Sequence, residues 1–466
     1  MTEQPATAIA EDTPPVEALH ENGLRPEFVR EVMAAIDAGD EARVRDLALE
    51  LHSADLADLI EQVGGDYRHA LVRMLGADFD AEVLSELDVA VREELLESLA
   101  PVTLAKAVSE LETDDAVDIL EDLEDDQQRE VLAAIPEADR RVIVEALSYP
   151  EDSAGRLMQR DLIAVPEFWT VGQTIDYLRE NQDLTTEFWE IFVVDPAYKP
   201  VGTLRLSAVL RTPRATPVKD IMQVEQTLIP VDMDQEQVAF RFQQYHLISA
   251  AVVDADGRLV GQITVDDIVD VINEEAGEDI LALAGVSEGD FSESVITTTR
   301  SRLTWLIANL ITAILASLVI WAFDQSIEKL VALAILMPIV ASMGGNAGTQ
   351  TMTVTVRALA TNQLTGANAM RILSREIKVS LINGLLFAIL MGGLAGLWFQ
   401  NALLGAVLGV AMIVNLLAAG LSGMLVPLAL ERLKIDPAVA SSVFVTTVTD
   451  VVGFFAFLGL AAYWLL

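Results

Sequence analysis

The sequence predicts a multi-domain membrane protein with an α-helical, solenoid-like N-domain, an α/β pair of similar modules and an all-α transmembrane domain of five helices. Three observations predict this fold class: a regular apolar repeat in the first third of the chain, two middle stretches that match one another, and five long apolar runs near the end. The predicted parts are a disordered tail at 1–23, the acidic helical N-domain at 24–150, the paired modules at 151–276, a connecting helix at 277–302 and the transmembrane domain at 303–466.

Charge is divided sharply along the 466 residues. From Arg300 onward there are nine Lys/Arg and six Asp/Glu, which leaves 21 Lys/Arg and 65 Asp/Glu before that point, a net charge of −44. Such a surface repels nucleic-acid phosphates and suits cations. A merely solubilising surface is the alternative. The chain has no cysteine, which excludes disulfides and thiolate metal sites. The first twenty residues lack the regions of a signal peptide and predict a disordered tail.

Apolar residues of the N-domain recur every 24 positions. One column is Leu51, Leu75, Leu99, Leu123 and Leu147, and the residues three and four positions before each member are also apolar. A second column is Ile36, Ile60, Leu84, Val108 and Leu132. This spacing is typical of short helices. Helix pairs with a fixed period stack as an α-solenoid, in which each repeat buries its apolar face on the next.

An acidic run, Glu112–Asp126, lies in the fourth repeat. Asp114 and Asp118 stand four residues apart on one helical face, where like charges destabilise the helix. A divalent cation would relieve that repulsion, and carboxylate oxygens suit Mg²⁺ or Ca²⁺. A solvated acidic face explains the run equally well.

The two middle modules match in short β-rich segments. Residues 192–195 (FVVD) match 251–254 (AVVD), and 201–209 (VGTLRLSAV) match 260–268 (VGQITVDDI). This order of elements resembles a tandem pair of CBS domains. The resemblance implies that Thr264 and Asp267 contact the ribose of ATP or another adenosine nucleotide. Because Arg205 and Ala208 stand at those positions in the first copy, a single site is expected; a purely structural pair is the alternative.

Five apolar runs are long enough to cross a bilayer: 303–323, 330–358, 377–399, 402–430 and 438–466. Basic residues gather before the first run and in the connections after the second and fourth runs. The positive-inside rule therefore predicts a cytoplasmic N-terminus and a C-terminus outside the cell membrane.

One carboxylate, Asp450, stands near the middle of the last run, with Ser442 and Thr446 on the same helical face. An ionisable group at bilayer depth indicates a functional site, although a carboxylate that fixes helix packing is the alternative. The second run carries Pro338 and then GGNAGTQ at 344–350. These residues can interrupt a helix, so that freed carbonyls line a polar cavity; close helix packing also explains the glycines. The candidate pore-lining residues are Gly345, Asn346, Asn415, Ser442 and Thr446.

Together the acidic N-domain, the CBS pair and five spans with PIVASMGGNAGTQ and TTVTDVVGF resemble the MgtE family of magnesium channels. The resemblance covers nearly the whole chain after the tail. It implies a homodimer in the lipid bilayer, with Asp450 binding hydrated Mg²⁺ in a central pore and cytosolic carboxylates binding further Mg²⁺ to close it. Tyr245 and His246 depart from the family, which can present an acid there. The candidate cytosolic ligands are Asp114, Asp118, Asp267, Asp270, Glu275, Glu278 and Asp279.

Two other classes stay open. Asp450 could exchange protons in a secondary transporter that couples H⁺ to divalent-cation movement, or the chain could be a membrane sensor that conducts nothing. An enzyme is not expected, because the chain has four histidines, no cysteine and no visible catalytic constellation. The sequence carries no Walker loop, which argues against an ATP-driven pump.

Overall fold

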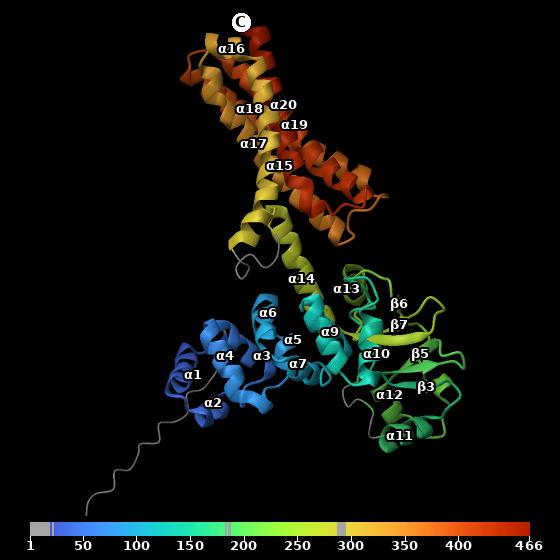
Figure 1. Ribbon diagram of the computed structural model, residues 1–466. Coiled ribbons are helices and arrows are strands. Elements are labelled where there is room, and N and C mark those ends of the chain that lie inside the picture. The colour runs from blue at the N-terminus through green and yellow to red at the C-terminus, as the bar shows by residue number, and fades with distance from the viewer. Residues whose placement is uncertain (1–18, 21–22, 182–183, 185–187, 287–294) are drawn as a thin grey trace, which may run out of the picture. The chain divides into compact units, whose positions relative to one another are not determined.

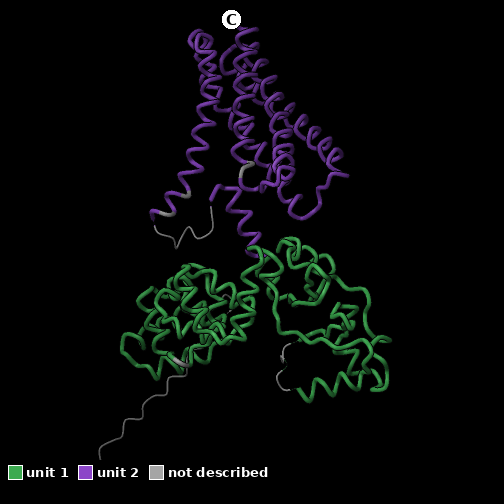
Figure 2. Tube along the Cα trace, turned by 45° about the vertical axis from the view of Figure 1, so that its right-hand side comes forward, with its two compact units in different colours: residues 1–271 green, residues 272–466 purple. Residues whose placement is uncertain are grey.

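A computed structural model describes residues 19–20, 23–181, 184, 188–286 and 295–466, without the side chains of 19, 20, 77, 297, 301, 440 and 441 (Figure 1). The chain divides into two compact units, 1–271 and 272–466 (Figure 2). Each unit is described by itself.

Short helices make up the N-terminal half of the first unit. Helices that are two apart in the numbering pack together: α2 on α4, α4 on α6 and α8 on α10. The helices are α1 Pro26–Ala38, α2 Glu41–Ala48, α3 Ser53–Gln62, α4 Gly65–Leu75, α5 Glu82–Ser85, α6 Val89–Ser98, α7 Pro101–Val108, α8 Thr113–Glu121, α9 Asp125–Ala134 and α10 Glu137–Ala146, with a 3-10 turn, η1, at Gly76–Asp78.

The predicted apolar repeat is confirmed as helical packing. Leu71, Leu95 and Ile119, at equivalent repeat positions, are at most 1% exposed. In the neighbouring column, Leu96 and Leu120 are at most 1% exposed, whereas Val144 is 48% exposed. It stands in the last repeat, where no further repeat follows to cover it, as expected at the end of a stacked array.

The predicted disordered tail is too long at its C-terminal end. Strand β1 (Leu19–His20) pairs antiparallel with β2 (Gly23–Leu24). Gly23 takes a φ of +100°, which favours glycine, and Leu24 is buried in the core of the helical array. The remainder of the predicted tail lies outside the described residues.

Two three-stranded sheets follow, and they repeat the same topology. In the order β3-β4-β5 and β6-β7-β8, the first pair is parallel and the second antiparallel. Strands β4 and β5 match β7 and β8 in the predicted alignment, and both copies carry a register shift at the same place. The elements are β3 Ala164–Pro166, α11 Val171–Glu180, β4 Glu190–Val194, β5 Pro200–Arg205, α12 Leu206–Arg211, η2 Val218–Asp220, β6 Leu228–Pro230, α13 Gln235–Tyr245, β7 Ser249–Val253 and β8 Leu259–Thr264.

The second unit holds five helices that are long and apolar enough to span a membrane within the described ranges. Helix α19 packs against α17, α18 and α20, and α15 packs on α20. The helices are α15 Val295–Ala322, α16 Asp324–Lys329, α17 Ala332–Ala360, α18 Ala369–Trp398, α19 Ala402–Arg432 and α20 Pro437–Trp464. The predicted combination of helical N-domain, paired α/β modules and five spans is confirmed.

Two details of the membrane part differ from expectation. The predicted connecting helix is not one element: α14 (Val265–Ala284) already begins within the second module, and the next described helix, α15, runs directly into the first span. Helix α17 is continuous through Pro338 and the glycines. Pro338 stands in the second turn of the helix, and Gly344 and Gly348 pack against neighbouring helices without interrupting α17.

Candidate functional site

Asp450 lies half-buried in the middle of α20, and Ser442 and Thr446 are half-buried on the same face. The Thr446 hydroxyl donates to the Ser442 carbonyl at 2.8 Å, which satisfies it within the helix. In the described part of the chain, no donor or cation pairs with the Asp450 carboxylate. A carboxylate in this setting can attract a cation from outside the protein.

Asn415 of α19 is 1% exposed and lies among three helices. Its Nδ2 donates to the Val340 carbonyl of α17 at 2.7 Å. A Cβ atom on Gly344 of α17 would clash with that nitrogen, and one on Gly453 of α20 would come within 2.7 Å of it. Within a single chain, Asn415 therefore belongs to helix packing, while its buried Oδ1 has no partner among the described atoms.

The glycine motif of α17 has two faces. Gly348 packs on α20, because a Cβ atom there would lie 2.6 Å from Val445. Gly345 has no neighbour within 4 Å of the corresponding position, and Asn346 is exposed. Close packing thus accounts for part of the motif, and Gly345 and Asn346 are available to line a path.

An acidic cluster forms in the first unit, where α8 approaches the start of α14. Desolvation, then the charge of Asp267, raise the pKa of Glu112 and of Asp115 to about 7 each. Desolvation also raises the pKa of Asp267 to about 6 and holds that of Asp114 well above its usual range. One Asp114 oxygen is buried and unpaired. No group of three His, Cys, Asp or Glu side chains in the described residues is close enough to hold a bare metal ion.

Asp118 does not share this environment with Asp114. Arg92 of α6, 3% exposed, donates to Asp118 and to Asp122 at 2.6 Å each. The Arg92 guanidinium therefore balances the charge of Asp118 within the N-domain. The sequence repeat could have predicted this ion pair, because Arg68 and Arg92 occupy equivalent positions in successive repeats. Each pairs with an acid of the following repeat, Arg68 with Glu94 as Arg92 with Asp118.

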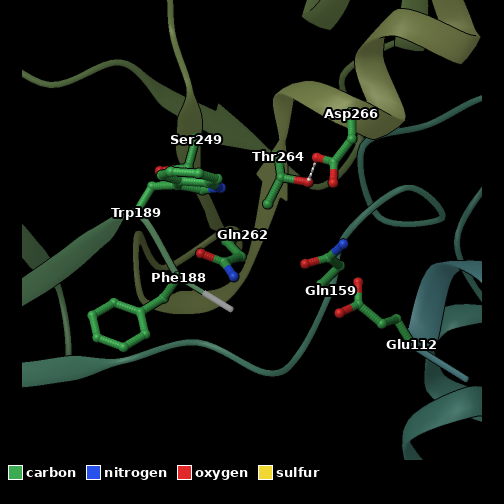
Figure 3. A pocket seen from close by; sticks show the side chains of 8 residues that line it. All are labelled: Glu112, Gln159, Phe188, Trp189, Ser249, Gln262, Thr264 and Asp266. Carbon is green, nitrogen blue, oxygen red and sulfur yellow. Dashed lines mark hydrogen bonds between the residues drawn. The ribbon is translucent and has the colours of Figure 1, made fainter. Parts of the chain in front are cut away.

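Thr264 and Asp267 lie together at the start of α14. The Asp267 carboxylate accepts from the Thr264 hydroxyl at 2.8 Å and from its backbone N–H at 3.3 Å, the arrangement that caps a helix N-terminus. Thr264 lines a small pocket that is partly open to solvent, and Asp266, not Asp267, is the neighbouring acid in its wall (Figure 3). The pocket is lined by Glu112, Gln159, Phe188, Trp189, Ser249, Gln262, Thr264 and Asp266.

The remaining predicted acids lie along α14. Asp270 belongs to the first unit, where desolvation and Asp266 raise its pKa. Glu275, Glu278 and Asp279 belong to the second unit, where Glu278 is exposed and the other two are half-buried. Desolvation, then the charge of Asp436 at the start of α20, raise the pKa of Asp279. The end of α14 thus brings a carboxylate close to the helix that carries Asp450.

Three family models match the chain. The model described as a divalent cation transporter, MgtE, matches residues 337–460; the MgtE intracellular N domain matches 51–152; and the CBS domain matches 218–274. The matched regions hold most of α17 and α20 with all of α18 and α19, the helical array from α3 to α10, and the second α/β module.

Whole-chain relatives agree with these matches. The chain is 34% identical over 433 residues to the magnesium transporter MgtE of Thermus thermophilus, covering 92% of this chain and 96% of that protein. It is 28% identical to the protein of the same name from Bacillus subtilis, covering 95% and 98%. A crystal structure of the cytosolic domain of the Mg²⁺ channel MgtE in complex with ATP is 32% identical over 52% of this chain and 99% of that one, with a TM-score of 0.49. With its helical array, α/β pair and membrane helices, the chain belongs to the MgtE family of magnesium transporters.

Proposed function

We propose that the protein is a Mg²⁺-selective channel that admits magnesium down its electrochemical gradient. The observation that carries the proposal is the unpaired Asp450 carboxylate in the middle of α20. Mg²⁺ keeps several waters when it binds proteins, so one or two carboxylates with neighbouring hydroxyls and amides suit it better than a full cage of ligands. Ser442, Thr446 and Asn346 would supply those contacts, and Gly345, which has no neighbour within 4 Å, would leave room for the ion and its waters.

The proposed functional form is a homodimer in the cell membrane, with the N-terminus in the cytoplasm and the C-terminus outside. Two chains would bring two Asp450 carboxylates to one path, enough to balance one divalent ion. Uptake needs no ATP, since moving two charges through 100 mV is worth about 4.6 kcal/mol.

The experiment is Mg²⁺ flux into liposomes that contain the purified full-length protein. Asp450→Asn removes the charge and keeps the side-chain shape, so flux should fall at least ten-fold. Glu431→Gln is the matched control, because it removes an exposed carboxylate at the end of α19 and should conduct as wild type. Wild-type flux through Asp450→Asn would assign the carboxylate to packing.

The main alternative is a proton-coupled transporter in which Asp450 takes up and releases H⁺. Current that reverses at the Mg²⁺ equilibrium potential whatever the pH gradient supports the channel. A reversal potential that moves with the pH gradient supports the transporter. Absence of any cation flux from wild-type protein in liposomes would favour a sensor that conducts nothing.

We further propose that cytosolic Mg²⁺ closes the channel. The support is the acidic cluster around Asp114, Asp115 and Asp267, whose raised pKa values reflect carboxylates held near one another away from water. Hydrated Mg²⁺ that bridges these carboxylates would favour the arrangement in which α8 lies against the start of α14. Mg²⁺ shifts the channel toward closure only because it binds that arrangement more tightly. Asp270, Glu275, Glu278 and Asp279 would extend the response along α14.

Deletion of residues 1–152 tests the gating proposal separately from permeation. The shortened channel should conduct, yet need more internal Mg²⁺ to close. In the full-length protein, limited proteolysis of the soluble part should slow as Mg²⁺ rises through the millimolar range. If the shortened channel closes at the same internal Mg²⁺ concentration as wild type, the N-domain takes no part in gating and its acidic face is only a solvated surface.

We also propose that the pocket beside Thr264 takes the adenosine end of a nucleotide. Trp189 supplies an aromatic surface for a base, while Thr264 and Ser249 supply hydroxyls for a ribose. Glu112 and Asp266 would repel a free polyphosphate, so a Mg²⁺-bound nucleotide suits the pocket better. ATP binding measured by calorimetry should weaken at least ten-fold in Trp189→Ala, with the exposed Phe168→Ala as control. The absence of ATP binding in wild type would leave the α/β pair a structural one.

A further inference from the structure

Helix α18 begins with three basic side chains on one face. Arg371, Arg375 and Lys378 stand at i, i+4 and i+7, so that they project within about 60° of one another around the helix. All three are exposed. These residues are called the basic edge below.

The same face continues along α18 as an exposed apolar stripe. Ile382, Leu385 and Ile389 follow Lys378 at helical spacing and are 60%, 54% and 68% exposed. Large apolar side chains in a row on a membrane helix are accommodated by lipid hydrocarbon. The basic edge therefore stands where that lipid-facing surface reaches the headgroups.

The length of the helix fits this placement. The rise from Lys378 to Trp398, which is 76% exposed, is about 30 Å along an α-helix and equals the thickness of the hydrocarbon core. Tryptophan is typical of the opposite membrane interface. The basic edge and Trp398 thus mark the two borders of the bilayer on α18.

No acidic side chain of the same helix neutralises the basic edge. Glu376 points about 140° away around the helix from Arg371 and is half-buried. In the residues that the structure describes, none of the ion pairs involves Arg371, Arg375 or Lys378. Their charges are available to a partner outside the chain.

We propose that the basic edge binds the phosphate headgroups of anionic phospholipids in the adjoining leaflet. Arginine forks match phosphate oxygens in bidentate fashion, and long basic side chains reach from the hydrocarbon border to the headgroups. Each basic residue at an anionic surface strengthens attraction roughly five-fold. The occupant is a lipid of the bilayer, because the exposed apolar stripe holds the acyl chains beside the same three charges.

The test is native mass spectrometry of the full-length protein released from nanodiscs of equal phosphatidylglycerol and phosphatidylcholine. Wild type should retain phosphatidylglycerol preferentially. The triple variant Arg371→Gln, Arg375→Gln, Lys378→Gln should lose that preference at least ten-fold. A second variant with lysine at 371 and 375 keeps the charges and should retain most of the preference.

Arg432→Gln with Lys434→Gln is the matched control, since it removes charges from the α19–α20 connection and leaves the basic edge intact. It should lose much less of the phosphatidylglycerol preference than the triple variant does. Protease accessibility of the soluble part establishes that each variant keeps its orientation. Undiminished phosphatidylglycerol preference in the correctly oriented triple variant overturns the proposal and leaves the three residues only a role in orientation. A loss of dimer without loss of lipid preference also overturns it and assigns the face to a second copy.

Discussion

Asp115→Asn should make the junction between α8 and α14 more stable in the absence of divalent ions. Asp115 stands in the first turn of α8, where desolvation and the charge of Asp267 raise its pKa from 3.8 to about 7. At pH 8, where the carboxyl is ionised, that rise means that the formed junction is about 4 kcal/mol less favourable for Asp115 than the open one. Screening by water and salt reduces the net effect of removing the charge to about 1–2 kcal/mol.

The sign of the pH dependence follows from the raised value. Above pH 7 the carboxyl is ionised whether or not the junction is formed, so the full cost opposes formation. Below pH 4 it is protonated in both states and the cost vanishes. Stability of the junction in wild type therefore rises as pH falls from 7 to 4. The difference between wild type and Asp115→Asn should disappear over the same range.

Hydrogen exchange of the α8 amides in the full-length protein measures this effect. At pH 8 with EDTA, protection in Asp115→Asn should exceed that of wild type five- to thirty-fold, and added Mg²⁺ should narrow the gap. Asp125→Asn is the control, because Asp125 is an exposed acid in the first turn of α9. Equal α8 protection in wild type and Asp115→Asn at pH 8 would refute the reasoning that repulsion opposes the junction.

Three further substitutions probe other parts of the chain. Arg92→Leu should destabilise the N-domain by about 3 kcal/mol in urea unfolding, because Asp122 keeps a half-buried charge without its partner, and adding Asp122→Asn should recover part of the loss. Gly453→Ala should lower the thermal stability of the membrane part by about 1–3 kcal/mol, because the new methyl group would clash with Asn415. A full rescue by Asn415→Ala would confirm that contact, whereas unchanged stability of Gly453→Ala would contradict it. With Mg²⁺ present to offset the repulsion between Asp267 and the acids of α8, Asp267→Ala should loosen the start of α14 by about 1 kcal/mol in hydrogen exchange. Unaltered protection there under this condition would exclude a capping role.

The overall fold was predictable because each part has its own periodicity. The apolar repeat placed Leu71, Leu95 and Ile119 in the core of the N-domain, and the internal match of the two modules anticipated the matching strands of the two sheets. The apolar runs located the five spans to within a few residues, except that α15 and α18 each begin about two turns before their runs. The first turns of both helices carry polar and basic residues, among them the basic edge of α18, which a count of apolar residues does not include.

The candidate site was less predictable because its partners come from distant segments. Asp114 and Asp118 look equivalent at i, i+4, yet Asp118 faces Arg92 and Asp114 faces Asp267. Helical spacing fixes the face of one helix and says nothing of what covers it. Asn415 looked like a candidate for a pore wall by its polarity, but glycines on two neighbouring helices give its side chain a packed place inside the chain.

The contact of Asn415 with Gly344 and Gly453 has a mechanical consequence. At these two glycines the backbones of α17 and α20 contact the Asn415 side chain directly. Sliding of either helix along α19 therefore requires the Asn415 amide to move and its hydrogen bond to the Val340 carbonyl to break. Translation of α20 along its axis is therefore resisted at this level. Asp450 stands three residues before Gly453 on the same helix, so this contact also fixes the depth of the carboxylate along the axis of α20.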